Sequence, residues 1–293
     1  MARRRVLLTG AGGYVARQLL PAFEERYDLV LLDASRPESP APNAESIEAD
    51  LTDPDLSSYR RAFQGADTIV HTAHRWDGQM ADSAPPQWKP RASPGHPDGY
   101  YVERSNIDMV FHLLKLALEE GIRRVVVTSS NHAADWYEAK LHAGRMDMVQ
   151  PDSYPLSDNL YGWAKACYEH LGFVFASGHF GRPVENLHIR IGAPRPIFGE
   201  GLKDDPVTYR RDLGAYISQR DLQQLYVRSI EAPDIRNEDG IPFQVFYGIS
   251  NNTRAYWSLV NARRVIGYAP KDDSEQVFAE DIARYLHAPG RTF

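Results

Sequence analysis

The chain has 293 residues, of which 43% are hydrophobic and 25% are charged, and its formal net charge at pH 7 is −6. This length is enough for one large domain or two small ones with a substantial buried core. The negative charge argues against a nucleic-acid-binding protein, because such proteins usually have a concentrated basic face.

The cysteine content and the lengths of the apolar runs indicate the cellular compartment of the protein. The single cysteine, Cys167, excludes an internal disulfide and fits a reducing environment. No apolar run approaches the ~18 residues of a membrane-spanning helix. The first apolar run ends at Thr9, so it is too short for a signal peptide. We therefore expect a cytoplasmic protein that binds neither membranes nor nucleic acids.

The first quarter of the chain alternates short apolar runs with amphipathic segments, which predicts βα units around a parallel sheet. We expect strands at residues 6–9, 29–32, 46–48 and 68–71, and helices over 14–25 and 56–63. The pattern disappears from residue 75 to 99, where five prolines and two tryptophans occur. This stretch predicts a long loop that covers a site or contacts a second subunit.

Periodicity returns after the loop. Apolar residues at helical spacing over 107–118, followed by Gly121, predict a helix and its C-terminal cap. We further expect strands at 124–128, 186–191 and 243–247, and a helix over 157–177. The predicted fold is therefore α/β, a doubly wound parallel sheet over residues 1–190 with the 75–99 loop inserted. Residues 191–293 form a small mixed region that we expect to bind substrate.

A glycine-rich turn joins the first predicted strand to the first helix. Gly10, Gly12 and Gly13 let the backbone approach a pyrophosphate, whose charge the amides at the helix start, Tyr14 and Val15, can hold. The usual third glycine of a Rossmann motif is Ala16 here. The end of the second strand carries Asp33, 23 residues after Gly10, and its carboxylate suits the ribose hydroxyls of an adenosine. This carboxylate would repel a 2′-phosphate, so the cofactor is expected to be NAD rather than NADP.

A second signal is Tyr161 followed four residues later by Lys165, which places both side chains on one helix face. Tyrosine ionises near pH 10, so it needs help to act as a base. A lysine cation and a positively charged nicotinamide both favour the phenolate and lower its pKa. Ser130, at the end of the preceding strand, supplies a hydroxyl to the same cleft. The three residues together predict a redox site.

With these residues the sequence resembles the extended short-chain dehydrogenase/reductase superfamily, which contains NAD-dependent epimerases and dehydratases. The resemblance covers nearly the whole chain, and it also includes Asn106 and the pair Asp50 and Leu51. In that superfamily the Asp-Leu pair lines the adenine pocket. The resemblance implies that Ser130, Tyr161 and Lys165 are the catalytic residues and that the last two also contact the cofactor.

Within the superfamily the sequence is most similar to uronate dehydrogenases. The similarity implies that Asn131 and His132 bind sugar hydroxyls and that Arg211 grips the substrate carboxylate. The family's serine after its Arg-Ile-Gly segment is Ala193 here, and the 75–99 and 133–153 segments are longer than expected. These departures bear on which substrate is bound rather than on the chemistry. We expect both long segments to lie near the entrance of the substrate site.

Three functions follow from these resemblances. The first is an NAD-dependent dehydrogenase that oxidises a uronate or related aldose at C1 to a lactone. The second is a nucleotide-sugar epimerase or dehydratase of the same superfamily, and the third is a non-catalytic NAD-binding protein. A homodimer is expected by analogy, through the helices that carry the stripes at 107–118 and 160–175.

Overall fold

The computed structural model describes residues 3–35, 44–76 and 97–286. Within them the chain forms one seven-stranded parallel sheet in the order β3-β2-β1-β4-β5-β6-β7. The strands are β1 (Arg5–Thr9), β2 (Asp28–Asp33), β3 (Glu45–Glu48), β4 (Thr68–His71), β5 (Arg124–Ser130), β6 (Glu185–Ile191) and β7 (Phe243–Gly248). The predicted doubly wound parallel sheet is therefore confirmed.

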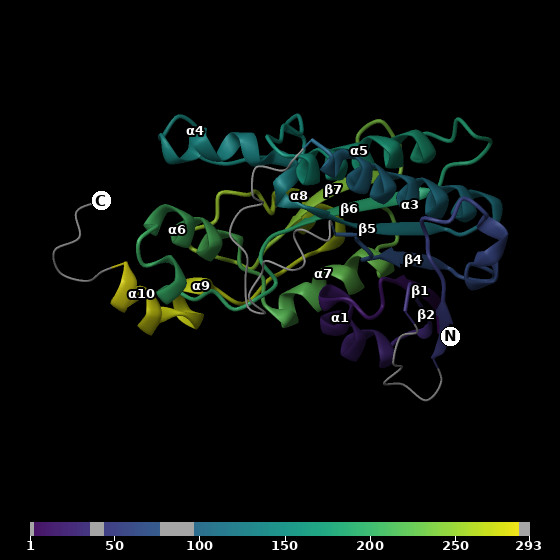
Figure 1. Ribbon diagram of the computed structural model, residues 1–293, viewed down its shortest axis with the longest axis horizontal. Helices are drawn as coiled ribbons and strands as arrows, with labels where there is room; N and C mark the ends of the chain where they lie inside the picture. Colours follow the sequence, from purple (N-terminus) through teal and green to yellow (C-terminus); the bar gives the residue numbers. More distant parts are fainter. Residues whose placement is uncertain (1–2, 36–43, 77–96, 287–293) are drawn as a thin grey trace.

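Helices cover both faces of this sheet (Figure 1). The first face carries α3 and α5, which pack against each other, and the second carries α1 and α7, which also pack together. The helices are α1 (Tyr14–Glu24), α3 (Gly99–Glu119), α4 (Glu138–His142), α5 (Leu160–Ala176), α6 (Pro206–Ala215), α7 (Gln219–Glu231), α8 (Val260–Ile266), α9 (Ser274–Val277) and α10 (Ala279–Tyr285). Because both faces are covered, the central strands are buried along most of their length, and all seven residues of β5 are buried.

Two predicted helices differ from the observed structure. Residues 56–63 form two short 3-10 turns, Leu56–Ser58 and Arg60–Ala62, instead of one α-helix. Tyr59 interrupts them with a φ of −129°, which is outside the helical range. The helix predicted from residue 157 begins at Leu160, because Asn159 has an extended backbone and its side chain accepts a hydrogen bond from Gly162 N at 2.8 Å.

The predicted strands and the first predicted helix are found within one or two residues of their expected ends, whereas the helix predicted over 107–118 begins earlier, at Gly99. The cap predicted at Gly121 is present, with a φ of +73° directly after α3. The predicted 75–99 loop lies mostly outside the described residues, and α3 begins at Gly99.

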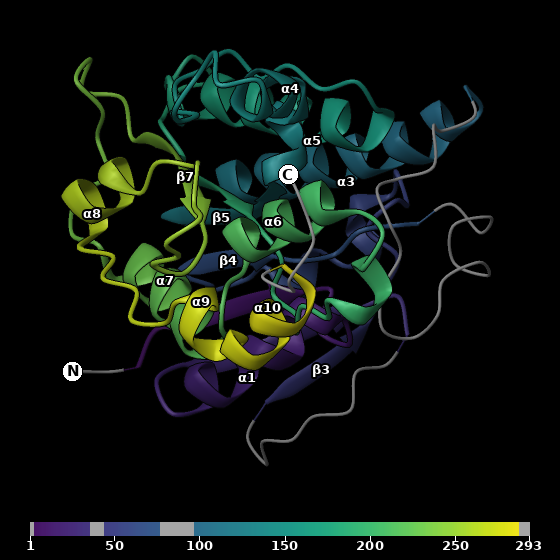
Figure 2. The same cartoon turned by 90° about the vertical axis from the view of Figure 1, so that its left-hand side faces the viewer.

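The C-terminal third contributes to the sheet as well as to the region beside it. β7 pairs with β6, and α7 packs on α1, so residues 219–248 complete the layers of the nucleotide-binding fold. α6, α9 and α10 group together at one end of the molecule (Figure 2). The division at residue 190 stays a prediction. No helix within the described residues has the length and apolar character to cross a membrane.

Candidate active site

The glycine turn between β1 and α1 approaches its neighbours closely. Gly10 has a φ of +71°, and a Cβ on it would lie 2.4 Å from the backbone nitrogen of Ala73, after β4. Its amide donates a hydrogen bond to Leu32 O at 2.8 Å, and its carbonyl accepts one from Gly13 N at 2.9 Å. The position thus requires glycine for both its conformation and its space.

Asp33 at the end of β2 meets this turn. Its Oδ2 accepts a hydrogen bond from Gly12 N at 2.9 Å, while Gly12 itself is exposed. The start of α1 lies beside them, with Tyr14 exposed and Val15 half-buried. An open glycine turn, a helix N-terminus and a carboxylate at one end of the sheet fit the pyrophosphate and ribose of a dinucleotide.

Asp50 and Leu51 follow β3 at the same edge of the sheet. Leu51 is buried, and its carbonyl accepts a hydrogen bond from His112 Nδ1 at 2.9 Å. Asp50 is exposed, and its Oδ1 accepts a hydrogen bond from Thr52 N at 2.8 Å. The pair therefore combines a buried leucine with one exposed carboxylate.

Ser130, Tyr161 and Lys165 come together where β5 ends and α5 begins. Ser130 lies close enough to the Tyr161 phenol to lower its pKa by hydrogen bonding. The ammonium of Lys165 lies 5.2 Å from the centre of the Tyr161 ring and donates to Thr128 O at 3.4 Å. Lys165 is buried, since only 3% of it is exposed. The three side chains thus form one cluster, as their residue types and spacing predicted.

Burial shifts the ionisation of both titratable groups in this cluster. It raises the pKa of the Tyr161 phenol to about 12, although the hydrogen bond with Ser130 acts in the opposite direction. It lowers the pKa of Lys165 to about 8, partly opposed by the negative charge of Glu103. In this state of the protein the phenol is therefore neutral at pH 7, and a further positive charge would favour its ionisation.

Glu103 was not identified from the sequence. Its Oε2 accepts a hydrogen bond from Asn106 Nδ2 at 3.3 Å, and its Oε1 lies 3.5 Å from His74 Nε2. Burial raises the pKa of Glu103 to about 7, against the lowering effects of Lys165 and Asn106. Its spacing, one helical turn before Asn106, is the signal that could have found it.

Asn106 holds the chain that leaves β4. Its Oδ1 accepts a hydrogen bond from Arg75 N at 2.7 Å, and its Nδ2 donates to Arg75 O at 2.9 Å. This brings Trp76 onto Tyr161, with ring centres 5.5 Å apart and planes inclined by 17°. His74 meets the edge of the same ring, at 5.1 Å. The start of the predicted covering loop therefore lies directly over the tyrosine.

His132 lies on another side of Tyr161, with ring centres 5.6 Å apart. Its Nδ1 is 2.6 Å from Asp135 Oδ2, which also accepts a hydrogen bond from Asn159 Nδ2 at 3.1 Å. Burial, the largest single effect, would raise the pKa of Asp135, but the interactions with His132, Arg211 and Asn159 together outweigh it and hold the pKa below its ordinary value. Asn131 is buried beside Ser130, and within the described residues nothing accepts a hydrogen bond from its Nδ2.

Arg211 on α6 joins the same group of residues. Its Nη2 is 3.8 Å from Asp135 Oδ1, and its Nε donates to Glu138 Oε1 at 3.0 Å. Its Nη1 donates to Asp212 Oδ1 at 3.3 Å. The sequence predicted that Arg211 binds the substrate, and in the structure Arg211 lies near His132. The three carboxylates around Arg211, those of Asp135, Glu138 and Asp212, were not predicted from the sequence.

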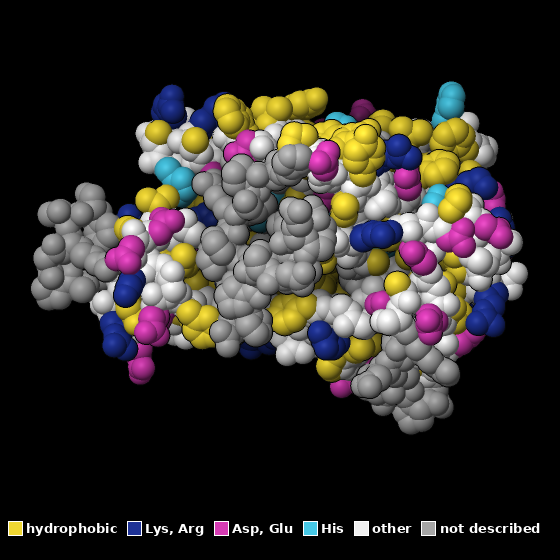
Figure 3. Space-filling model, viewed as in Figure 1, with side chains coloured by type: hydrophobic (Ala, Val, Ile, Leu, Met, Phe, Trp, Pro, Cys, Tyr) yellow, Lys and Arg dark blue, Asp and Glu magenta, His cyan; other side chains and the backbone are white. Residues whose placement is uncertain are grey.

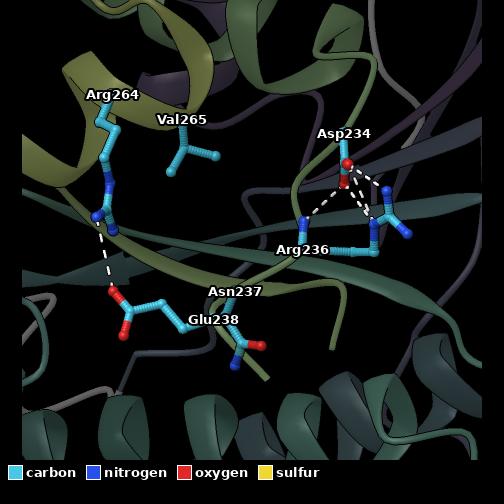
Figure 4. Close-up of a pocket in the computed structure, with 6 residues that line it drawn as sticks. All are labelled: Asp234, Arg236, Asn237, Glu238, Arg264 and Val265. Atoms are coloured by element: carbon cyan, nitrogen blue, oxygen red, sulfur yellow. Dashed lines mark hydrogen bonds and ion pairs between the residues drawn. The ribbon is translucent and has the colours of Figure 1, made fainter. Parts of the chain in front are cut away.

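Neither a metal site nor the open pocket near β7 offers an alternative to this site within the described residues. Among the described residues, no group of three or more histidines, cysteines or carboxylates could hold a metal ion. An open pocket lies before β7, at the opposite edge of the sheet from the glycine turn (Figure 4). It is lined by Asp234, Arg236, Asn237, Glu238, Arg264 and Val265. Its charged groups are exposed and form ion pairs, such as Arg236 with Asp234, so it offers no cluster of catalytic type.

Residues 6–223 match the sequence pattern of the NAD dependent epimerase/dehydratase family. The chain is 31% identical over 286 residues to an NAD-dependent glucose-6-phosphate dehydrogenase of Haloferax volcanii, covering 92% of this chain and 94% of that protein. It is 30% identical to a uronate dehydrogenase of Pseudomonas putida, with 92% and 85% covered. A crystal structure of a mutant uronate dehydrogenase from Agrobacterium tumefaciens, complexed with NAD, superimposes with a TM-score of 0.71 at 26% identity, covering 99% and 92%.

Proposed function

Because the chain belongs to the NAD dependent epimerase/dehydratase family, and is thus an enzyme that uses NAD, we propose that it oxidises the C1 hydroxyl of a free sugar to a lactone. The observation that carries this proposal is the cluster of Ser130, Tyr161 and Lys165 at the end of the sheet where the glycine turn lies. The three relatives described above are all dehydrogenases of sugars, and they support oxidation over other chemistry.

Each residue of the cluster has a distinct task. Tyr161 accepts the proton of the sugar hydroxyl, and Ser130 donates a hydrogen bond to the same oxygen. The cation of Lys165 favours the phenolate form of Tyr161. As the O–H and C–H bonds break, the carbonyl of the lactone forms. NAD, when bound, supplies the acceptor for the hydride that leaves the carbon.

The remaining residues of the site would position the sugar. Asn131, whose Nδ2 has no hydrogen-bond acceptor within the described residues, and His132, next to Tyr161, could each bind a sugar hydroxyl. Trp76, Tyr161 and His74 present aromatic faces and edges to the same space, and such surfaces suit the C–H faces of a sugar ring. These contacts support a small polyhydroxylated substrate.

The test is the formation of reduced nicotinamide, followed by absorbance, with NAD and a panel of free aldoses, free uronates and nucleotide sugars. Stoichiometric reduction with a free sugar is expected. Turnover of a nucleotide sugar without net reduction would instead assign an epimerase of the same family. NAD binding with no turnover of any compound would indicate a non-catalytic NAD-binding protein.

A Tyr161→Phe variant tests the mechanism. It keeps the ring but removes the proton acceptor, so kcat should fall by about 10²–10⁴-fold with NAD affinity retained. Tyr101→Phe, at an exposed position on α3, is the matched control and should keep full activity. Full activity of Tyr161→Phe would refute the assigned role.

We also propose that the protein forms a homodimer through α3 and α5. Figure 3 shows hydrophobic side chains gathered over this helical layer, at the top of the view. Phe111 and Phe180 are 41% and 52% exposed, and both rings contact the buried Phe175. Light scattering after size exclusion should give a dimer, and Phe111→Lys should give a monomer. Val207→Lys, on exposed α6 surface, is the control.

A further inference from the structure

The positive charge of Arg211 is neutralised by carboxylates of the same protein. Its guanidinium is bonded through Nε to Glu138 and through Nη1 to Asp212, and both carboxylates are at least 97% buried. Burial would lower the pKa of Arg211, but the charges of Glu138 and Asp212 outweigh it and raise the pKa above its ordinary value. The cation therefore has its counter-charges in place before a substrate arrives.

The wider group includes a third carboxylate and a second guanidinium. Asp212 also accepts a hydrogen bond from Arg195 Nη2 at 2.9 Å, and Asp135 lies 3.8 Å from Arg211. The carboxylates of Asp135, Glu138 and Asp212 thus lie against the guanidinium groups of Arg211 and Arg195. A substrate carboxylate brought into this buried group would meet repulsion as well as attraction.

Two polar atoms in this group make no hydrogen bond within the described residues. Asp135 Oδ1 and Arg211 Nη2 are buried, and neither has a hydrogen-bond partner within the described residues. They lie 3.8 Å apart, so one small group could contact both. A hydroxyl donates one hydrogen bond and accepts others, and it would satisfy the carboxylate oxygen and the guanidinium together. A carboxylate oxygen only accepts, so it would leave Asp135 Oδ1 unsatisfied and next to a like charge.

This pair of atoms is connected to the reacting end of the site. The other oxygen of Asp135 is bonded to His132, whose ring contacts Tyr161. It also accepts a hydrogen bond from Asn159, which caps the helix that carries Tyr161. A sugar whose C1 hydroxyl reaches Tyr161 would therefore extend its more distant groups toward Asp135 and Arg211.

We propose that this part of the site binds a hydroxyl of an uncharged sugar, and that the enzyme prefers neutral aldoses to uronates and sugar phosphates. Arg211 then acts as a hydrogen-bond donor to a hydroxyl, with Asp135 as the acceptor. Glu138 and Asp212 determine this specificity by cancelling the charge that a substrate anion would need. The inference rests on the proposed function and narrows its substrate class.

The first experiment compares sugars that differ only at C6. Galactose is paired with galacturonate, and glucose with both glucuronate and glucose 6-phosphate, and kcat/KM for NAD reduction is measured for each. We expect the neutral sugar to exceed its anionic counterpart at least 10-fold. An anionic sugar that equals or exceeds the neutral one would overturn this inference and leave the proposed function standing. No reduction with any of the five would overturn both.

A double variant tests the cause of the preference. Glu138→Gln with Asp212→Asn keeps the hydrogen-bonding shapes but removes two negative charges beside Arg211. The ratio of kcat/KM for galacturonate to that for galactose should rise at least 10-fold. The exposed Glu238→Gln is the matched control and should leave the ratio unchanged. An unchanged ratio in a double variant that retains activity on galactose would refute the roles of Glu138 and Asp212. If the double variant does not fold, the comparison of neutral and anionic sugars with the unmodified protein still tests the proposal.

Discussion

The amide of Gly12 donates a hydrogen bond to Oδ2 of Asp33 across 2.9 Å, so the glycine turn and the end of β2 are held together before a cofactor binds. A Cβ on Gly12 would lie 3.4 Å from the same carboxylate oxygen. The contact thus orders the carboxylate at the edge where the nucleotide is expected, and it connects the two sequence features that predicted NAD.

The first prediction concerns this carboxylate. Asp33→Asn should raise the KM for NAD by about 10-fold or more, because an amide accepts hydrogen bonds from ribose hydroxyls more weakly than a charged carboxylate does. The KM for NADP should change less or fall, since the repulsion of a 2′-phosphate is removed. Initial rates with both cofactors measure this. Asp28→Asn, at the exposed start of the same strand, should change neither value.

The second prediction concerns the pH dependence of the reaction. The pKa of Tyr161 is raised to about 12 by burial, so the phenol needs positive charge nearby to ionise near neutrality. Lys165→Met removes that charge. The rise of kcat/KM with pH should therefore move to higher pH by one unit or more, together with a lower kcat at pH 7.

The stability of the same variant separates this effect from misfolding. The pKa of Lys165 is lowered to about 8, so the unfolded chain binds the proton more tightly than the folded one. Below pH 8 the buried ammonium thus opposes folding, and this penalty fades as pH rises toward the ordinary lysine pKa. The melting temperature of Lys165→Met at pH 7 should be equal to or higher than that of the parent protein. An unshifted pH profile would contradict the role of Lys165.

The third prediction concerns a buried ion pair in the core. Both oxygens of Glu169 accept hydrogen bonds from Arg190, at 2.8 and 2.7 Å, and Ser129 Oγ donates to one of them at 2.9 Å. Glu169→Gln leaves a buried guanidinium without its counter-charge, so the free energy of unfolding should fall by about 3–5 kcal/mol. Urea unfolding measures the change. Glu25→Gln, at an exposed pair with Arg26, should cost less than about 1 kcal/mol.

The fourth prediction concerns the glycine after Tyr161. A Cβ on Gly162 would lie 2.1 Å from His132 O and 2.2 Å from Ser157 Oγ, so α5 and the segment after β5 would have to separate. Gly162→Ala should lower the free energy of unfolding by about 1–3 kcal/mol, as overpacking does, and should lower kcat by moving Tyr161. Gly201→Ala, where no atom lies within 4 Å, is the control. Parental activity and stability in Gly162→Ala would contradict the close contact.

Much of the fold and part of the site follow from short stretches of sequence. The alternation of apolar and amphipathic segments predicted the strands and most of the helices. Side chains on one face of a strand recur every two residues, and those on one face of a helix recur every 3.6 residues. The turn at Gly10 and the four-residue spacing of Tyr161 and Lys165 are also local, and the structure shows both as expected. The sequence by itself therefore determined the nucleotide-binding fold and the grouping of Ser130, Tyr161 and Lys165.

Tertiary structure alone decided what surrounds that cluster. Arg211 meets Glu138, 73 residues away in sequence, and Trp76 stacks on Tyr161 across a similar separation. Such pairs depend on how segments far apart in the sequence pack together, and the local repeat of apolar residues does not predict them. The charge balance at a buried group is the sum of these distant contacts. The resemblance to uronate dehydrogenases thus predicted that Arg211 binds a carboxylate, whereas the packing of Glu138 and Asp212 around it supports the proposal that it binds a hydroxyl.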